Sequence, residues 1–132
     1  MTIEEIIQAH EGTKLYPYTD TVGKLTIGTG HNLTDNGISR QVAELLLKED
    51  ITIAQNALKN IFDNFEELPI NVQNALTDMM FNMGKPRFLG FKKMIAAVKQ
   101  GDFKEASRQA KDSKWCKQVG LRCTDDAQLM TL

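Results

Sequence analysis

The longest element that the sequence predicts lies between Ser39 and Phe62, a stretch without Gly or Pro. Within it, apolar residues recur near helical spacing, at Val42, Leu46, Ile53, Ala57 and Ile61. Ser39 is a favourable N-cap residue, and it follows a turn predicted over residues 34–37. We therefore predict one long helix, which a break near Asp50 could divide. Such a helix can join two lobes.

The residues before this helix predict a shorter helix and a hairpin. Thr2 and Glu5 fit a capping box, and Gly12 is a natural helix end, so Glu11 falls in the last helical turn. Short β-prone runs on either side of an Asp/Gly turn, over residues 16–28, are typical of a hairpin.

Alternation along the second strand gives the hairpin two faces. Leu25 and Ile27 share one face, and we expect Thr26 to point away from it, towards an open side.

Several shorter helices are predicted after the long one. Pro69 suits the first position of a helix whose apolar stripe runs to Gly84. Four more helices follow. The first carries Phe91 and Val98, and the second starts from an Asp102 cap. The third contains Trp115, and the fourth starts from a Thr124 cap.

Together these elements predict a mostly α, α+β fold with one small antiparallel sheet. A length of 132 residues favours a single domain. We expect a β lobe over about 12–38, a linking helix over about 39–63, and a helical lobe over about 64–132 that also includes helix 1–11.

The charge balance limits the function. Lys plus Arg is 16 and Asp plus Glu is 17, so we expect no nucleic-acid partner, although a local basic patch remains compatible with these totals. No signal sequence and no run of ~20 apolar residues is present, so we expect no stable membrane anchoring and a chain made in a cytoplasm.

The two cysteines, Cys116 and Cys123, are expected to be reduced thiols, because seven residues of continuous helix would hold them about 10 Å apart. A loop at Gly120 could bring them closer. His10 and His31 are the only histidines and no Cys/His spacing fits zinc, so we expect no metal site. We also expect no cofactor.

Glu11, Asp20 and Thr26 are the candidate catalytic residues. Hydrolysis of a glycosidic bond uses a protonated carboxyl group and an ionised carboxylate. The negative end of the helix dipole favours protonated Glu11, while Asp20 at a solvated turn stays ionised and activates a water with Thr26. On residue types alone, a helix-end Glu and a turn Asp are more often structural than catalytic.

The run Glu11-Gly-x-x-Leu-x-x-Tyr-x-Asp20-x-x-Gly-x-x-Thr26-Ile-Gly-x-Gly-His31 resembles the phage-type lysozymes, glycoside hydrolase family 24. The stretches 81–84, 90–91 and 102–115 resemble the C-terminal lobe of the T-even type endolysins in that family. The resemblance implies a lysozyme-like two-lobe fold with the substrate between the lobes. It also implies that Glu11 is the proton donor, with Asp20 the second carboxylate and Thr26 the water-positioning residue.

The implied reaction is hydrolysis of the β-1,4 bond between N-acetylmuramic acid and N-acetylglucosamine in peptidoglycan, with inversion. By position, the resemblance places substrate contacts at Asn32, Leu33, Phe81, Asn82 and Gln109. On pattern alone, Phe81 fits the core better than a sugar contact, and the two polar residues of the far lobe also fit a solvated surface.

Three further residues take structural roles by the same resemblance. His31 and Asp50 would form an ion pair between the hairpin lobe and the long helix. Arg122 would contact Glu11 and oppose the effect of the helix dipole.

The implied setting is a monomeric, bacteriolytic endolysin that reaches the periplasmic cell wall of an infected host through a holin. Two features differ from the family: the chain is not basic, and the segment after Trp115 is short and divergent. A sugar-binding module and a lytic transglycosylase therefore stay as alternatives.

Overall fold

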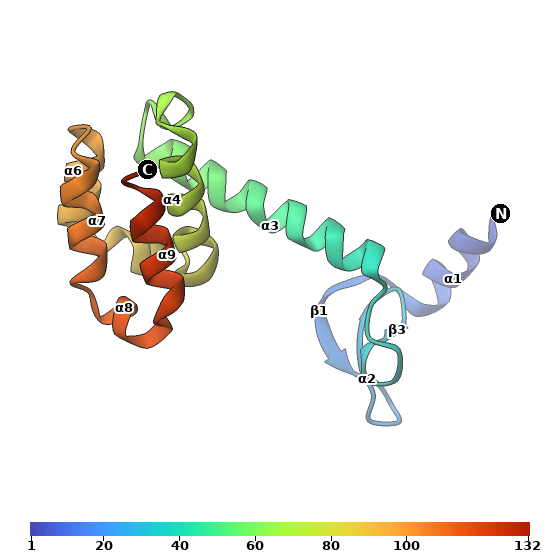
Figure 1. Ribbon diagram of the computed structural model, residues 1–132. Helices are drawn as coiled ribbons and strands as arrows, with labels where there is room; N and C mark the ends of the chain where they lie inside the picture. Colours follow the sequence, from blue (N-terminus) through green and yellow to red (C-terminus); the bar gives the residue numbers. More distant parts are fainter. The chain divides into compact units, whose positions relative to one another are not determined.

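A computed structural model describes residues 1–132 and divides them into two compact units, Met1–Leu45 and Leu46–Leu132. The boundary falls within the long helix α3 (Arg40–Ile61), which is labelled in Figure 1. This arrangement confirms a mostly helical α+β fold with one small sheet. Each unit is described in turn.

The first unit begins with helix α1 (Ile3–Glu11), and the predicted capping box is present. The Thr2 hydroxyl accepts a hydrogen bond from the Glu5 N–H at 3.1 Å, and the Glu5 carboxylate accepts one from the Thr2 N–H at 3.4 Å. The helix ends at Gly12, whose N–H donates to the Gln8 carbonyl at 2.8 Å. Glu11 is thus the last helical residue, as predicted.

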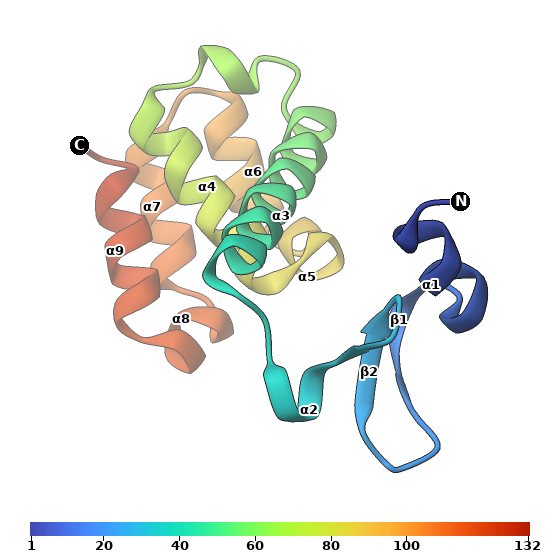
Figure 2. The same ribbon diagram turned by 90° about the vertical axis from the view of Figure 1, so that its right-hand side faces the viewer.

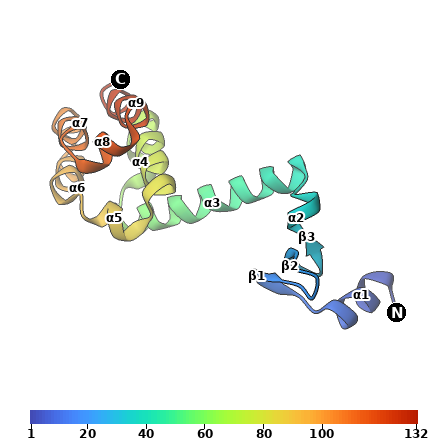
Figure 3. The ribbon, with the colours of Figure 1, turned by 90° about the horizontal axis from the view of Figure 1, so that it is seen from below.

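A three-stranded antiparallel sheet follows, with strands β1 (Lys14–Thr19), β2 (Leu25–Gly28) and β3 (His31–Asn32) in that order. The hairpin of β1 and β2 was predicted, whereas the two-residue strand β3 was not. Figure 3 shows β3 leading into α2 (Leu33–Asn36), a single helical turn where a simple turn was expected. Strand β2 is therefore the central strand.

Helix α3 is continuous, and its start is the predicted one. The Ser39 hydroxyl accepts a hydrogen bond from the Val42 N–H at 3.2 Å. The anticipated break near Asp50 is absent. The Thr52 hydroxyl donates to the Lys48 carbonyl at 3.0 Å, so this polar side chain finds its partner within the helix.

The second unit packs short helices around one apolar core. After the end of α3 its elements are η1 (Phe65–Glu67), α4 (Ile70–Met83), α5 (Lys85–Leu89), α6 (Lys92–Lys99), α7 (Phe103–Lys111), α8 (Lys114–Val119) and α9 (Leu121–Leu129). Figure 2 shows α9 beside α4 and α7, and α6 lies against α7. The largest fully buried side chains include Leu58, Phe62, Leu76, Met79 and Phe88.

Two helix boundaries differ from the sequence-based prediction. Pro69 precedes α4 as its N-cap instead of opening it. Thr124 does not cap the last helix, because α9 starts directly after Gly120 and contains Thr124 in its second turn. Gly120 has a φ of 63°, a conformation that ends α8 and lets α9 begin at once.

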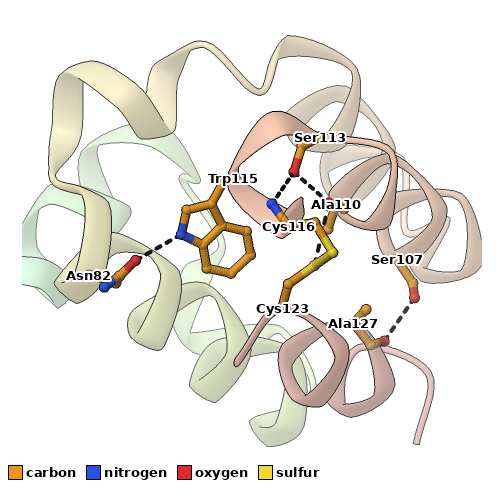
Figure 4. The surroundings of a disulfide bond; sticks show 8 residues. All are labelled: Asn82, Ser107, Ala110, Ser113, Trp115, Cys116, Cys123 and Ala127. Atoms are coloured by element: carbon orange, nitrogen blue, oxygen red, sulfur yellow. Dashed lines mark hydrogen bonds between the residues drawn. A yellow bond between two sulfur atoms is a disulfide. The ribbon is translucent and has the colours of Figure 1, made fainter. Parts of the chain in front are cut away.

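The cysteines also differ from expectation. Cys116 and Cys123 form a disulfide, with their Cα atoms 5.0 Å apart, so the prediction of two reduced thiols is wrong (Figure 4). The turn at Gly120 is the reason, because it replaces the continuous helix that would have separated the cysteines.

None of the helices has both the length and the apolar composition needed to cross a membrane.

Candidate active site

Glu11 lies against the turn between β2 and β3. A Cβ atom built at Gly30 would be 3.0 Å from both Cδ and Oε2 of Glu11. Gly30 also has a φ of 72°, a backbone conformation that favours glycine, and a side chain there would displace the Glu11 carboxyl group. The glycine therefore gives the Glu11 carboxyl group room at the surface of this unit, where Glu11 is exposed.

Asp20 is held by the backbone of the turn that follows β1. Its Oδ1 accepts hydrogen bonds from the N–H groups of Val22 at 3.0 Å and Lys24 at 2.8 Å. This is an Asx-type turn, the arrangement for which Asp is favoured at such positions. Oδ2 makes no hydrogen bond within the protein, so one carboxylate oxygen stays available.

Thr26 is buried, with 4% of its surface exposed, so the expectation that it points to an open side is wrong. The cause is its place in the central strand, where it pairs with Tyr18 of β1 and Asn32 of β3. The Thr26 hydroxyl donates to the Lys24 carbonyl at 3.0 Å. Its hydrogen is therefore engaged, while its oxygen can still accept a hydrogen bond.

The backbone of Lys24 links two of the candidate residues. Its N–H binds the Asp20 carboxylate, and its carbonyl accepts from both the Thr26 hydroxyl and the Asp20 N–H, the latter at 2.9 Å. One peptide segment thus fixes Asp20 and Thr26 together. The sequence spacing alone did not reveal this connection, because it depends on hydrogen bonds within the hairpin turn.

The two predicted substrate contacts of the first unit lie at the start of α2. Asn32 caps that helix: its Oδ1 accepts from the Asp35 N–H at 3.0 Å, and its Nδ2 donates to the Asp35 carboxylate at 2.9 Å. Leu33 follows and is half-buried. The Asn32 amide therefore has a clear structural role, and its role as a substrate contact stays a prediction.

His31 also bonds within its own unit. Its Nε2 lies 2.5 Å from the Gly37 carbonyl oxygen. Asp50, its predicted partner, belongs to the second unit, so that ion pair stays a prediction.

The predicted contacts in the second unit come from α4 and α7. Asn82 accepts a hydrogen bond from the indole N–H of Trp115 at 2.7 Å (Figure 4). Gln109 donates to the Glu105 carboxylate at 2.8 Å. Phe81 is 42% exposed, so it is not wholly part of the core stripe. The substrate roles of these three residues stay predictions.

Arg122 pairs with Asp78 through two hydrogen bonds, Nε to Oδ2 at 3.0 Å and Nη2 to Oδ1 at 2.7 Å. Burial alone would raise the pKa of Asp78, but the hydrogen bonds from Arg122 and Asp126 outweigh it and lower that pKa. The predicted contact between Arg122 and Glu11 spans the two units and stays a prediction.

Sequence reasoning missed Asp126, which is 2% exposed and has an Oδ2 without a hydrogen-bond partner. Burial, together with the neighbouring Asp78 carboxylate, raises the pKa of Asp126 to about 8. Nothing in the sequence distinguishes Asp126 from its exposed neighbour Asp125, so from the sequence both would be expected to lie at a solvated surface.

No group of three or more His, Cys, Asp or Glu side chains is placed to hold a metal ion.

Comparisons with known proteins show the family to which the chain belongs. The profile of the Phage lysozyme family matches residues 8–126. A probable T4-type lysozyme 2 of Dictyostelium discoideum is 27% identical over 92% of this chain and 88% of its own length. The pre-baseplate central spike protein Gp5 of Enterobacteria phage T4 is 27% identical over 94% of this chain but 26% of its own.

An endolysin of Salmonella phage P22 is 31% identical over 64% of this chain and 62% of its own length. The alignment with the Dictyostelium protein covers 150 positions, more than this chain contains, so that relative carries residues absent here. The matched range contains the positions of Glu11, Asp20 and Thr26, and it ends within α9 of the second unit. On this match, the chain belongs to the Phage lysozyme family, whose relatives support a lysozyme-type glycoside hydrolase.

Proposed function

We propose that this chain hydrolyses the β-1,4 bond between N-acetylmuramic acid and N-acetylglucosamine in peptidoglycan. The observation that carries the proposal is the Lys24 backbone, which holds the Asp20 carboxylate by its N–H and the Thr26 hydroxyl by its carbonyl. A carboxylate and a hydroxyl group held by the backbone of one residue suit the binding and activation of one water molecule.

In the proposed reaction, the protonated Glu11 carboxyl group donates its proton to the glycosidic oxygen as that bond breaks. Water attacks the anomeric carbon from the opposite face, and the Asp20 carboxylate accepts the proton that the water loses. Thr26 accepts a hydrogen bond from the water, since its own hydrogen is directed to the Lys24 carbonyl. The product is an inverted hemiacetal, and Glu11 and Asp20 exchange one proton with solvent to complete the cycle.

The test is digestion of purified peptidoglycan, followed by identification of the new glycan ends. Hydrolysis leaves reducing N-acetylmuramic acid, whereas a lytic transglycosylase leaves 1,6-anhydro ends. Binding without any cleavage would support a sugar-binding module. Anhydro ends or a lack of cleavage would each refute the proposed hydrolysis.

Glu11→Gln tests the proton donor, because the amide has no acidic proton to transfer. We expect kcat to fall by at least 100-fold, the lower range for loss of a general acid. Glu4→Gln is the matched control, since Glu4 is an exposed residue of the same helix, at its other end. Equal kcat values for the two variants would remove Glu11 from the proton-donor role.

We further propose that the protein acts as a monomeric endolysin, released by a holin to the periplasmic wall. The match to an endolysin of Salmonella phage P22 supports this setting. Expression in a Gram-negative host should lyse cells only when a holin is coexpressed. Lysis without a holin would show a different route to the wall.

A further inference from the structure

The charges of this nearly neutral chain are unevenly distributed. Residues 85–117 contain ten Lys and Arg but only three Asp and Glu, although the whole chain has 16 and 17. This basic segment covers α5 to α8 of the second unit. A strong local excess of positive charge favours an anionic ligand.

Four of these cations gather around one surface groove, which we call the basic groove. It has a volume of about 570 Å³ and is lined by Arg87, Lys92, Lys93 and Lys114 among its residues. None of the four forms a salt bridge: the Arg87 guanidinium donates to the Gln118 side chain at 2.8 Å, and the three lysines are exposed. They are therefore free to bind an external anion.

The nearby carboxylates do not neutralise the groove. Asp112 is the only acidic residue that lines it. Glu105 is close enough to feel the charge of Lys93, but it is hydrogen-bonded to Arg108 at 2.8 Å and 2.6 Å and to Gln109 at 2.8 Å. Four cations thus face one lining carboxylate and one carboxylate that is already paired.

The groove adjoins residues expected to contact substrate. Gln109 lines it directly, and so does Trp115, whose indole N–H binds Asn82. Phe91 packs edge-to-face on Trp115, with ring centroids 6.3 Å apart, which gives the groove a fixed apolar wall. The groove therefore suits a ligand that combines anionic groups with an apolar or amide-bearing backbone.

Resting on the proposed function, we propose that the basic groove reads the free carboxylates of the peptide stems of peptidoglycan. Arg87, Lys92, Lys93 and Lys114 would be specificity-determining residues. They make the chain selective for wall whose stems carry carboxylates over wall whose stems are amidated. The glycan itself offers little negative charge, so the stem carboxylates are the groups that such a cluster can distinguish.

The experiment uses one batch of purified peptidoglycan, half of which is amidated on its stem carboxylates by carbodiimide coupling with ammonia. Binding of the Glu11→Gln chain to each half is measured by cosedimentation, so cleavage is not required. We expect the unmodified wall to bind about tenfold more tightly at low salt, and the difference to shrink as salt screens exposed charges. Equal affinity for the two halves at low salt would overturn the proposal.

Lys92→Gln/Lys93→Gln, added to Glu11→Gln, tests the groove itself. This pair should reduce the ratio of the two affinities by about three- to tenfold, the range for two exposed ion pairs. The matched control is Lys99→Gln/Lys104→Gln, which removes the same charge from exposed lysines outside the groove and should keep the ratio. An equal loss of the affinity ratio in both double variants would show a general charge effect and refute the proposed role of the groove.

The outcome is independent of whether the chain cleaves glycans. Preferential binding without cleavage would support the groove and refute the proposed hydrolysis. Cleavage with equal affinity for both walls would do the reverse.

Discussion

The two units of this chain are held together differently. In Leu46–Leu132, apolar side chains from α3 to α9 form one buried core. In Met1–Leu45, Thr26 is the only buried residue, and its neighbours are fixed by backbone hydrogen bonds, caps and turns. All three candidate catalytic residues lie in Met1–Leu45, the unit without an apolar core. Substitutions should therefore change mainly stability in one unit and mainly chemistry in the other.

The largest expected effect is on the core. Phe88 is 0% exposed and packs edge-to-face on Phe62, with ring centroids 6.5 Å apart. Phe88→Ala should lower the free energy of unfolding by about 3–5 kcal/mol, since it leaves a cavity. Leu89→Ala is the control, because Leu89 is next in the same helix and 43% exposed, and should cost about 1 kcal/mol or less. Urea denaturation measures both, and similar losses would contradict a continuous core at α5.

A second effect concerns the one buried acid of the core unit. Burial and the Asp78 carboxylate raise the pKa of Asp126 from its usual 3.8 to about 8, so the folded chain binds a proton that the unfolded chain releases. Between these values, the free energy of unfolding should fall as pH rises, by at most about 1.4 kcal/mol per pH unit. Arg122, Asp78 and Asp125 are the charged groups that act on it.

Asp126→Asn removes this titration but keeps a donor for Asp78. The variant should be more stable than the parent at pH 7, and its advantage should grow from pH 5 to pH 7. Asp125→Asn is the matched control, because Asp125 is exposed and adjacent. Urea midpoints at several pH values measure the difference. A parent and variant with parallel pH profiles would show that Asp126 is ionised in the fold.

The features that the sequence predicted are those with local causes. The Thr2 capping box, the Ser39 cap and the Asp102 cap each involve residues three apart, so they can be identified from the sequence. Local signals also placed Glu11 at a helix end and Asp20 in a turn, whereas their proposed catalytic roles came from the resemblance to the lysozyme family. These signals were enough for the order of the major elements.

The features that were missed depend on contacts between segments. The disulfide requires the turn at Gly120, and the burial of Asp126 requires α9 to pack on α4 and α7. The burial of Thr26 follows from β3, which is only two residues long and has no periodic signal of its own. A one-dimensional pattern does not contain these neighbours, and so it placed Thr26 on an open side.

The smallest expected effect on stability, and the sharpest test of the comparison, is at Asp20. Its Oδ1 accepts two backbone hydrogen bonds, and an Asn side chain can accept the same two while carrying no charge. Asp20→Asn should therefore change the free energy of unfolding by less than about 0.5 kcal/mol, whereas Asp20→Ala should lower it by about 1 kcal/mol. Both variants should lose most activity on peptidoglycan, because neither has a carboxylate to accept the proton from water. If Asp20→Asn keeps full activity while Asp20→Ala loses it, the role of Asp20 is to hold the turn and Thr26, and the base lies elsewhere. A loss in both, with stability retained only in Asp20→Asn, separates the chemistry of this unit from its structure.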